Sequence, residues 1–209
     1  GVFNHVSRNH PAVQAALDET AGRLNPADNP WHGLVRAHVG DNGEPSLDVF
    51  EGHGDLVALD HSADETVDYV AHVMSHWLDR GAAGWRLDAA YAVPSPFWAR
   101  VLPQVKAAHP YSWIFGEVIH GDYPRIIEES TMDSITQYEL WKSIQHALET
   151  ENFFELDWNL KRHNAFLDSF VPQTFIGNHD VTRIASQIGP AKAALALAVL
   201  MTVGGVPSI

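Results

Sequence analysis

The stretch GWRLD at residues 84–88 is a short apolar run that ends in a carboxylate. Two later stretches have the same form, WIFGE at residues 113–117 and FIGNHD at residues 175–180. Each has the length of a buried strand, and each precedes a loop and a helical pattern. When strands and helices alternate, residues at the strand ends converge on one rim of a parallel barrel. The acids Asp88, Glu117 and Asp180 are therefore expected to lie together.

The rest of the chain fits the same α/β order. Strands are predicted near residues 84–88, 112–117, 132–136, 173–178 and 204–209. Helices are predicted from a Ser62/Glu65 capping box to Gly81, from Ser95-Pro96 onward, and near 138–149, 153–168 and 190–201. This alternation predicts parallel strands with outer helices.

Residues 6–60 differ from this pattern. They are rich in Pro, Gly, Asn, Asp and His, and they show little periodicity. So long an irregular segment in a compact domain is usually functional. We expect it to be an excursion from the barrel rim.

Composition excludes several classes of protein. A formal charge of −13 argues against a nucleic-acid partner, which would require clustered Lys and Arg. The absence of cysteine excludes a disulfide scaffold and a thiolate metal site. The longest apolar stretch, Ala193–Met201, is far short of the roughly 20 residues of a membrane span. The composition does not fix the cellular compartment of the protein, and the cytoplasm is slightly favoured.

Asp88 follows Arg86 by two positions, so the two side chains share one face of a strand. A guanidinium beside a carboxylate favours its charged form, as the nucleophile of a glycosidase requires. The alternative is a buried ion pair that closes the barrel end.

Glu117 ends an apolar strand, where burial would favour the protonated carboxyl group that a general acid needs. The alternative is a glutamate that faces solvent. His179 can donate to a sugar hydroxyl, and Asp180 can accept from neighbouring hydroxyls. Their alternative is a turn with an N-cap aspartate. Two carboxylates that flank a sugar can break a glycosidic bond, and a third can hold the substrate.

Four short motifs, in order, resemble those of the α-amylase family of retaining glycoside hydrolases and transglycosylases. They are VFNH at residues 2–5, GWRLD at 84–88, GE at 116–117 and NHD at 178–180. The stretch GVPS at 205–208 also resembles the start of the last barrel strand of that family. One such motif is weak, but four in order at family-like spacing are specific.

The resemblance implies a partial catalytic (β/α)₈ barrel made of residues 1–5 and 61–209. Residues 6–60 would be a small inserted domain after the third strand, forming one wall of the cleft. The roles implied for single residues follow the family motifs. Asp88 would be the nucleophile, Glu117 the acid and then the base, and Asp180 the group that stabilises the distorted sugar. Arg86 would orient Asp88, and His5 and His179 would bind the sugar.

The activity implied is retaining hydrolysis of α-glucosidic bonds in starch-like glucans or malto-oligosaccharides. The small Ala89 after the nucleophile resembles members that prefer α-1,4 bonds. The alternatives are an α-glucosidase or transglycosylase of the same family, and a non-catalytic barrel that serves as a binding or transporter subunit.

The chain also departs from the family pattern. The first two barrel strands are absent and the last is cut short, so we expect a fragment of a longer protein. Tyr91-Ala92 stand where many secreted members have Lys-His, which puts their acceptor contacts in doubt. Asn4 matches a calcium ligand of many members, so calcium is a candidate, while no other metal or cofactor is expected.

Overall fold

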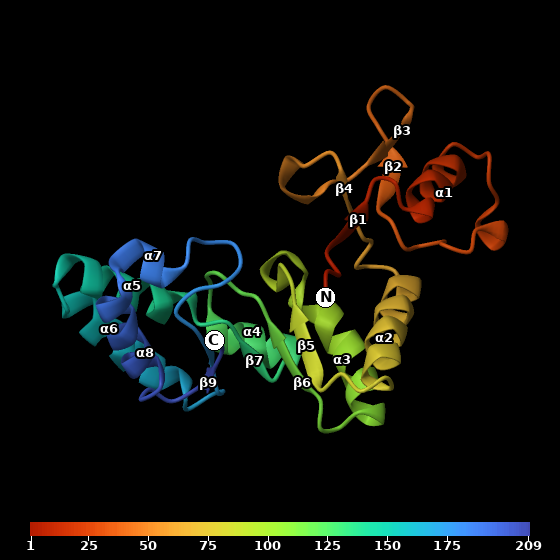
Figure 1. Cartoon of the computed structure of the whole chain (residues 1–209). Coiled ribbons are helices and arrows are strands. Elements are labelled where there is room, and N and C mark those ends of the chain that lie inside the picture. Colours follow the sequence, from red (N-terminus) through yellow and green to blue (C-terminus); the bar gives the residue numbers. More distant parts are fainter. The chain divides into compact units, whose positions relative to one another are not determined.

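The computed structural model describes every residue from Gly1 to Ile209 (Figure 1). The chain forms two compact units, Gly1–Trp113 and Ile114–Ile209. The first contains, in order, β1 (His5–Ser7), α1 (Pro11–Thr20), β2 (Ala37–Val39), β3 (Pro45–Leu47), β4 (Leu56–Ala58), α2 (Asp64–Leu78), β5 (Gly84–Leu87) and α3 (Ser95–Ala108). After β6 (Trp113–Gly116), the second contains α4 (Tyr123–Ser130), β7 (Ser134–Ile135), α5 (Tyr138–Thr150), α6 (Phe154–Phe166), β8 (Gln173–Thr174), α7 (Ile184–Ile188), α8 (Pro190–Leu200) and β9 (Val206–Pro207).

The strands of the second unit are parallel, as predicted. β6 pairs with β7, so that Phe115 lies beside Ser134 and Gly116 beside Ile135. A single parallel bridge joins Thr136 to Gln173, and β8 then pairs in parallel with β9. Helices separate every pair of successive strands. The alternation of strands and helices is therefore confirmed here.

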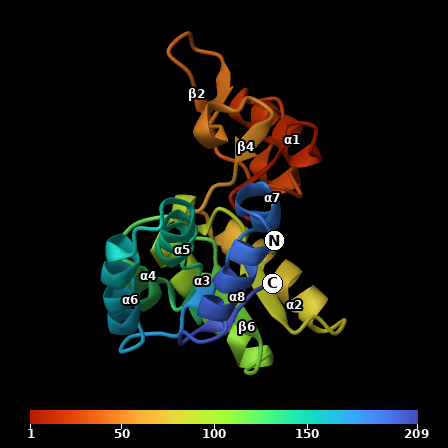
Figure 2. The ribbon, with the colours of Figure 1, turned by 60° about the vertical axis from the view of Figure 1, so that its left-hand side comes forward.

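Helices α5, α6 and α8 share the apolar core of this unit, and they lie side by side in Figures 1 and 2. Ile144, Ala147 and Ala196 are fully buried at their contacts. Buried side chains recur every three or four residues along α5, the spacing of one helical face. None of the helices in the structure is both long and apolar enough to span a membrane.

In the first unit, α2 and α3 pack on each other beside β5 (Figure 1). The indole of Trp85 on β5 donates a hydrogen bond to the carbonyl of Met74 on α2 at 3.2 Å. Trp98 of α3 meets Phe3 with ring centroids 6.3 Å apart. The N-terminal residues lie alongside the end of β5, because Val2 forms a single parallel bridge with Asp88.

Residues 6–60 contain more regular structure than the sequence suggested, between loops. They contain helix α1, an antiparallel β2–β3 hairpin and an antiparallel β1–β4 pair. Pro11 looked like a helix breaker, yet proline is favoured in the first turn of a helix. The ring of His10 caps this helix by accepting from the amide of Ala12 at 3.2 Å. The helix then buries Ala12, Val13 and Ala16 in a small core with Val57 and Leu59.

Three local predictions need correction. Ser62 does not cap α2, because its hydroxyl and amide both donate to Asp60, and Ala63 takes the N-cap position. The strand predicted at 173–178 ends at Thr174, since its partner β9 offers only two paired residues. Phe175 is buried by packing against Tyr138 and Trp141 rather than by strand pairing. Helix α4 was not predicted, although Asp122 caps it and proline lies in its first turn.

Gly84 is required by a close backbone contact. A Cβ atom at this position would lie 1.9 Å from the carbonyl oxygen of Trp113. The contact is with backbone, which cannot rotate away as a side chain can. This explains why a glycine opens the GWRLD stretch.

We predict that Gly84→Ala lowers the free energy of unfolding by about 3 kcal/mol or more, because overpacking against fixed backbone forces strands apart. Gly54→Ala is the matched control, since nothing lies within 4 Å of a Cβ there. Its unfolding free energy should change by no more than about 1 kcal/mol. Urea unfolding of both variants measures the difference, and equal effects would contradict the structure at β5.

Candidate active site

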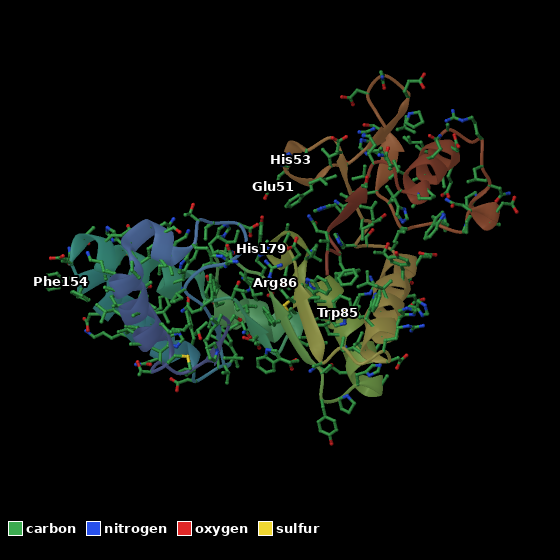
Figure 3. All side chains as sticks on the ribbon, in the orientation of Figure 1. Glu51, His53, Trp85, Arg86, Phe154 and His179 are labelled. Atoms are coloured by element: carbon green, nitrogen blue, oxygen red, sulfur yellow. The ribbon has the colours of Figure 1, made fainter.

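Asp88 follows the last residue of β5 and is held by Arg86. The guanidinium Nη1 atom lies 2.6 Å from Asp88 Oδ1. The two side chains are 30% and 31% exposed, so the pair is half-buried rather than buried. The alternative of a buried pair that only closes the barrel is therefore wrong. Figure 3 shows Arg86 on β5, and its carboxylate partner is both oriented and accessible.

His5 belongs to the same half of the site. Its pKa is lowered by burial, and the nearby carboxylate of Asp88 opposes this by raising the pKa. The net effect is a lowered pKa of His5, so its imidazole is neutral near pH 7. A neutral imidazole can both donate a hydrogen bond to a hydroxyl group and accept one from it. The ring of Phe50 stacks on it, with centroids 5.0 Å apart and planes inclined by 21°. This ring contact was not predicted from the sequence.

Glu51 is a residue that the sequence did not single out. Its backbone has φ 48° and ψ 32°, the left-handed region that a non-glycine residue seldom adopts. Tyr91, three residues after Asp88, donates its hydroxyl hydrogen to Glu51 Oε1 at 3.1 Å. Phe50 and Glu51 line a pocket of about 300 Å³ together with Asn4, Arg36 and His61. In the sequence, only the glycine that follows Glu51 indicated a tight turn at this position.

Glu117 lies one residue beyond β6 and is 7% exposed. The alternative of a solvent-facing glutamate is therefore wrong. Its Oε1 atom accepts a hydrogen bond from the hydroxyl of Tyr138 at 2.9 Å. Tyr138 is the first residue of α5, which begins just after the neighbouring strand β7. Its part in the site was missed because the aromatic ring fits the apolar face of the helix.

The loop after β8 carries Asn178, His179 and Asp180, and His179 is marked in Figure 3. Asn178 Nδ2 donates to the hydroxyl of Tyr138 at 2.9 Å, and Asn178 Oδ1 accepts from the amide of Asp180 at 3.0 Å. The side chains of His179 and Asp180 are 65% and 59% exposed and lie 3.4 Å apart. Asp180 is not an N-cap, since Arg183 takes that position for α7. Hydrogen bonds thus connect Glu117 to the Asp180 loop.

Each unit therefore carries half of the predicted site. His5, Arg86 and Asp88 meet in the first unit, and Glu117, His179 and Asp180 belong to the second. The retaining-type spacing of Asp88 and Glu117 stays a prediction.

Metal-ligating side chains do not gather in the structure. No group of three or more His, Asp or Glu is placed to hold an ion. The amide of Asn4, which suggested calcium, is buried, and its nitrogen lies 3.5 Å from Nδ1 of His5. One amide oxygen falls well short of the six to eight ligands that calcium takes.

A sequence model of the family described as "Alpha amylase, catalytic domain" matches residues 1–209. The chain belongs to the α-amylase family. Its resemblance to that family, first seen in short motifs, is thus confirmed over the full length.

Curated α-amylase relatives include cyclomaltodextrinases of two bacteria. That of Thermoanaerobacter pseudethanolicus is 30% identical over 220 residues, which cover 100% of this chain and 37% of the relative. That of a Bacillus species is 27% identical over 217 residues, which cover 100% of this chain and 38% of the relative. The chain therefore spans less than two-fifths of the length of these proteins.

Solved structures of α-amylase relatives show the same fold. A hydrolase of cyclic α-maltosyl-(1→6)-maltose from Arthrobacter globiformis superposes with a TM-score of 0.80 at 20% identity, covering 99% of this chain and 48% of that one. Such neighbours are barrel enzymes, so the predicted (β/α)₈ barrel is confirmed as a partial catalytic domain.

The electrostatic interaction of Asp88 with His5 leads to a prediction about the pKa of His5. Asp88→Asn removes the negative charge that raises the pKa of His5, so this pKa should fall further below its ordinary value of 6.5. A titration of the imidazole proton resonances by NMR, assigned with a His5→Gln variant, measures it.

Asp60→Asn is the matched control. The Asp60 carboxylate raises the pKa of His61, so this variant should lower the pKa of His61 and leave that of His5 in place. An unchanged or raised pKa of His5 in the Asp88→Asn variant would contradict the arrangement described for the first unit.

Proposed function

We propose that the protein is a retaining glycoside hydrolase that cleaves α-1,4-glucosidic bonds in malto-oligosaccharides or starch-like glucans. The observation that carries the proposal is a pair of carboxylates in unlike settings. Asp88 is accessible and held by a guanidinium, whereas Glu117 is buried and held by a neutral hydroxyl. Unlike settings are what two carboxylates with different tasks in one site need.

In the first step, Glu117 gives its proton to the glycosidic oxygen while the bond from that oxygen to the anomeric carbon breaks. Asp88 attacks the anomeric carbon from the opposite face and forms a β-glycosyl ester. The electron pair of the broken bond leaves with the protonated sugar alcohol. Arg86 holds the Asp88 carboxylate in position for attack.

In the second step, Glu117 is ionised and takes a proton from water. The water oxygen attacks the anomeric carbon, the ester bond breaks, and the carboxylate of Asp88 is restored. Two inversions give net retention. Asp180 and His179 would bind hydroxyls of the distorted sugar, and the neutral His5 would also bind a sugar hydroxyl.

The substrate class is supported by the relatives, which are named cyclomaltodextrinase, maltogenic α-amylase and neopullulanase. Residues 6–60 are proposed as the small domain inserted after the third barrel strand. They would supply one wall of the cleft, with Phe50 stacked on His5 and Glu51 bonded to Tyr91. Residues 1–5 and 61–209 would then be the catalytic barrel.

The roles of Glu117 and Asp88 can be separated by giving the full-length protein two substrates with different leaving groups. Glu117→Gln should lower kcat/KM on maltotriose by about 10²–10⁴-fold, because a sugar alkoxide needs a proton to depart. It should largely spare kcat/KM on α-glucosyl fluoride, since fluoride leaves without one. Steady-state kinetics on both substrates measures the contrast.

Asp88→Asn is the matched change at the other carboxylate. It should remove both activities, because no nucleophile remains. Added azide should restore turnover of the fluoride by the Glu117→Gln variant, since azide attacks without a general base. Equal loss of the fluoride reaction in both variants, with no rescue, would leave a glucan-binding barrel as the better reading.

The preference for α-1,4 bonds is tested with maltose and isomaltose. Ala89 follows the nucleophile, is 5% exposed and has φ 46°, so its side chain is small at a constrained position. A small residue there leaves room for the acceptor sugar of an α-1,4 bond. The full-length enzyme should have the higher kcat/KM on maltose, and faster hydrolysis of isomaltose would overturn the proposed linkage.

A further inference from the structure

We propose that Tyr138 is the positioning residue for the acid and base work of Glu117. Its hydroxyl would fix which oxygen of the Glu117 carboxyl group carries the catalytic proton. The inference rests on the proposed function, and it assigns a role to a residue outside the motifs that suggested that function.

The direction of the hydrogen bonds around Tyr138 is set by the backbone. The amide N–H of Asp180 donates to Asn178 Oδ1 at 3.0 Å. This contact fixes the orientation of the Asn178 side chain, so its Nδ2 group faces Tyr138 and donates to the phenol oxygen at 2.9 Å. A phenol has a single hydrogen. With a donor already on one side, that hydrogen is directed to Glu117 Oε1 at 2.9 Å.

The ring that presents this hydroxyl is held on two sides. Phe175 meets it edge-on with centroids 4.9 Å apart, and Trp141 does so at 5.5 Å. Tyr138 is 7% exposed and sits at the first position of α5. A ring packed in this way loses little further freedom when it forms a hydrogen bond, so the hydroxyl is preorganised.

The backbone on either side of Glu117 is fixed by the same segment. The amide of Thr136 donates to the carbonyl of Gly116 at 3.1 Å. The hydroxyl of Thr136 accepts from the amide of Val118 at 2.9 Å. Thr136 therefore holds the residues before and after Glu117, while Tyr138 holds its side chain.

These contacts have a chemical consequence. In a protonated carboxyl group, the oxygen that accepts a hydrogen bond is the carbonyl oxygen, and the proton is on the other oxygen. Donation from Tyr138 to Oε1 thus places the acidic proton on Oε2. In the second step, the same contact stabilises the carboxylate that takes the proton from water. Tyr138 acts through Glu117 and does not touch the substrate in this scheme.

The test uses the full-length enzyme and the two leaving groups. Tyr138→Phe keeps the ring and removes only the hydroxyl, so kcat/KM on maltotriose should fall by about 10- to 100-fold, the effect of losing a hydrogen bond to a charged group. On α-glucosyl fluoride, kcat/KM should fall by less than about threefold, because that departure needs no proton. Asn178→Ala should cause a smaller loss with the same selectivity.

Tyr123→Phe is the matched control. This tyrosine is fully buried in the same unit, and its hydroxyl donates to the carbonyl of Ile119 at 3.2 Å, away from Glu117. Removal of this hydroxyl should change kcat/KM by the same factor on both substrates. Equal losses on both substrates for Tyr138→Phe, or no loss on either, would overturn the inference while leaving the proposed function intact. A parent enzyme that hydrolyses neither substrate would overturn the proposed function and the inference together.

Discussion

Parallel pairing at the carboxyl ends of the strands is the constraint on which both halves of the site depend. In the second unit, the register of β6 and β7 sets Gly116 beside Ile135, so Glu117 and the Thr136–Tyr138 segment leave the sheet at the same end. The bridge from Thr136 to Gln173 aligns β8 with them. In the first unit, the bridge from Val2 to Asp88 similarly brings His5 toward the nucleophile candidate. An antiparallel pair would send successive strand ends to opposite edges.

The surroundings of the two carboxylates follow from the elements next to them. The guanidinium that pairs with Asp88 belongs to Arg86, two residues earlier on the preceding strand. Glu117 receives a neutral donor from the helix that follows the next strand. A guanidinium suits a group that must attack as an anion, whereas a neutral hydroxyl suits one that must alternate between two protonation states. The proposed division of labour would thus follow from the neighbouring residue that each strand end contacts.

The sequence predicted the strand ends well because apolar runs that stop at a carboxylate have few structural interpretations. The five predicted strands and the five predicted helices, α2, α3, α5, α6 and α8, were found. Asp88 and Glu117 each lie one residue beyond a strand, whereas Asp180 lies in the loop after β8. Helix α1 was missed because its proline signals either a break or a first turn, and only packing against Val57 and Leu59 decides between them. Ser62 failed as a cap because Asp60 competes for its hydroxyl, which depends on the fold of the preceding turn. Tyr138 and Glu51 act through contacts to residues 21 and 40 positions away, and no local pattern encodes such pairs.

The central claim is that Asp88 forms a covalent bond to the sugar while Glu117 handles the proton. The most direct test is to incubate the full-length Glu117→Gln variant with α-glucosyl fluoride, digest it under denaturing conditions and map the peptides by mass spectrometry. Without its base, the variant should accumulate the intermediate. The account predicts a mass increase of one anhydroglucose unit on the peptide that contains Asp88, and its loss when azide is added. A sugar attached to any other residue, or fluoride turnover with no attached sugar, would contradict it.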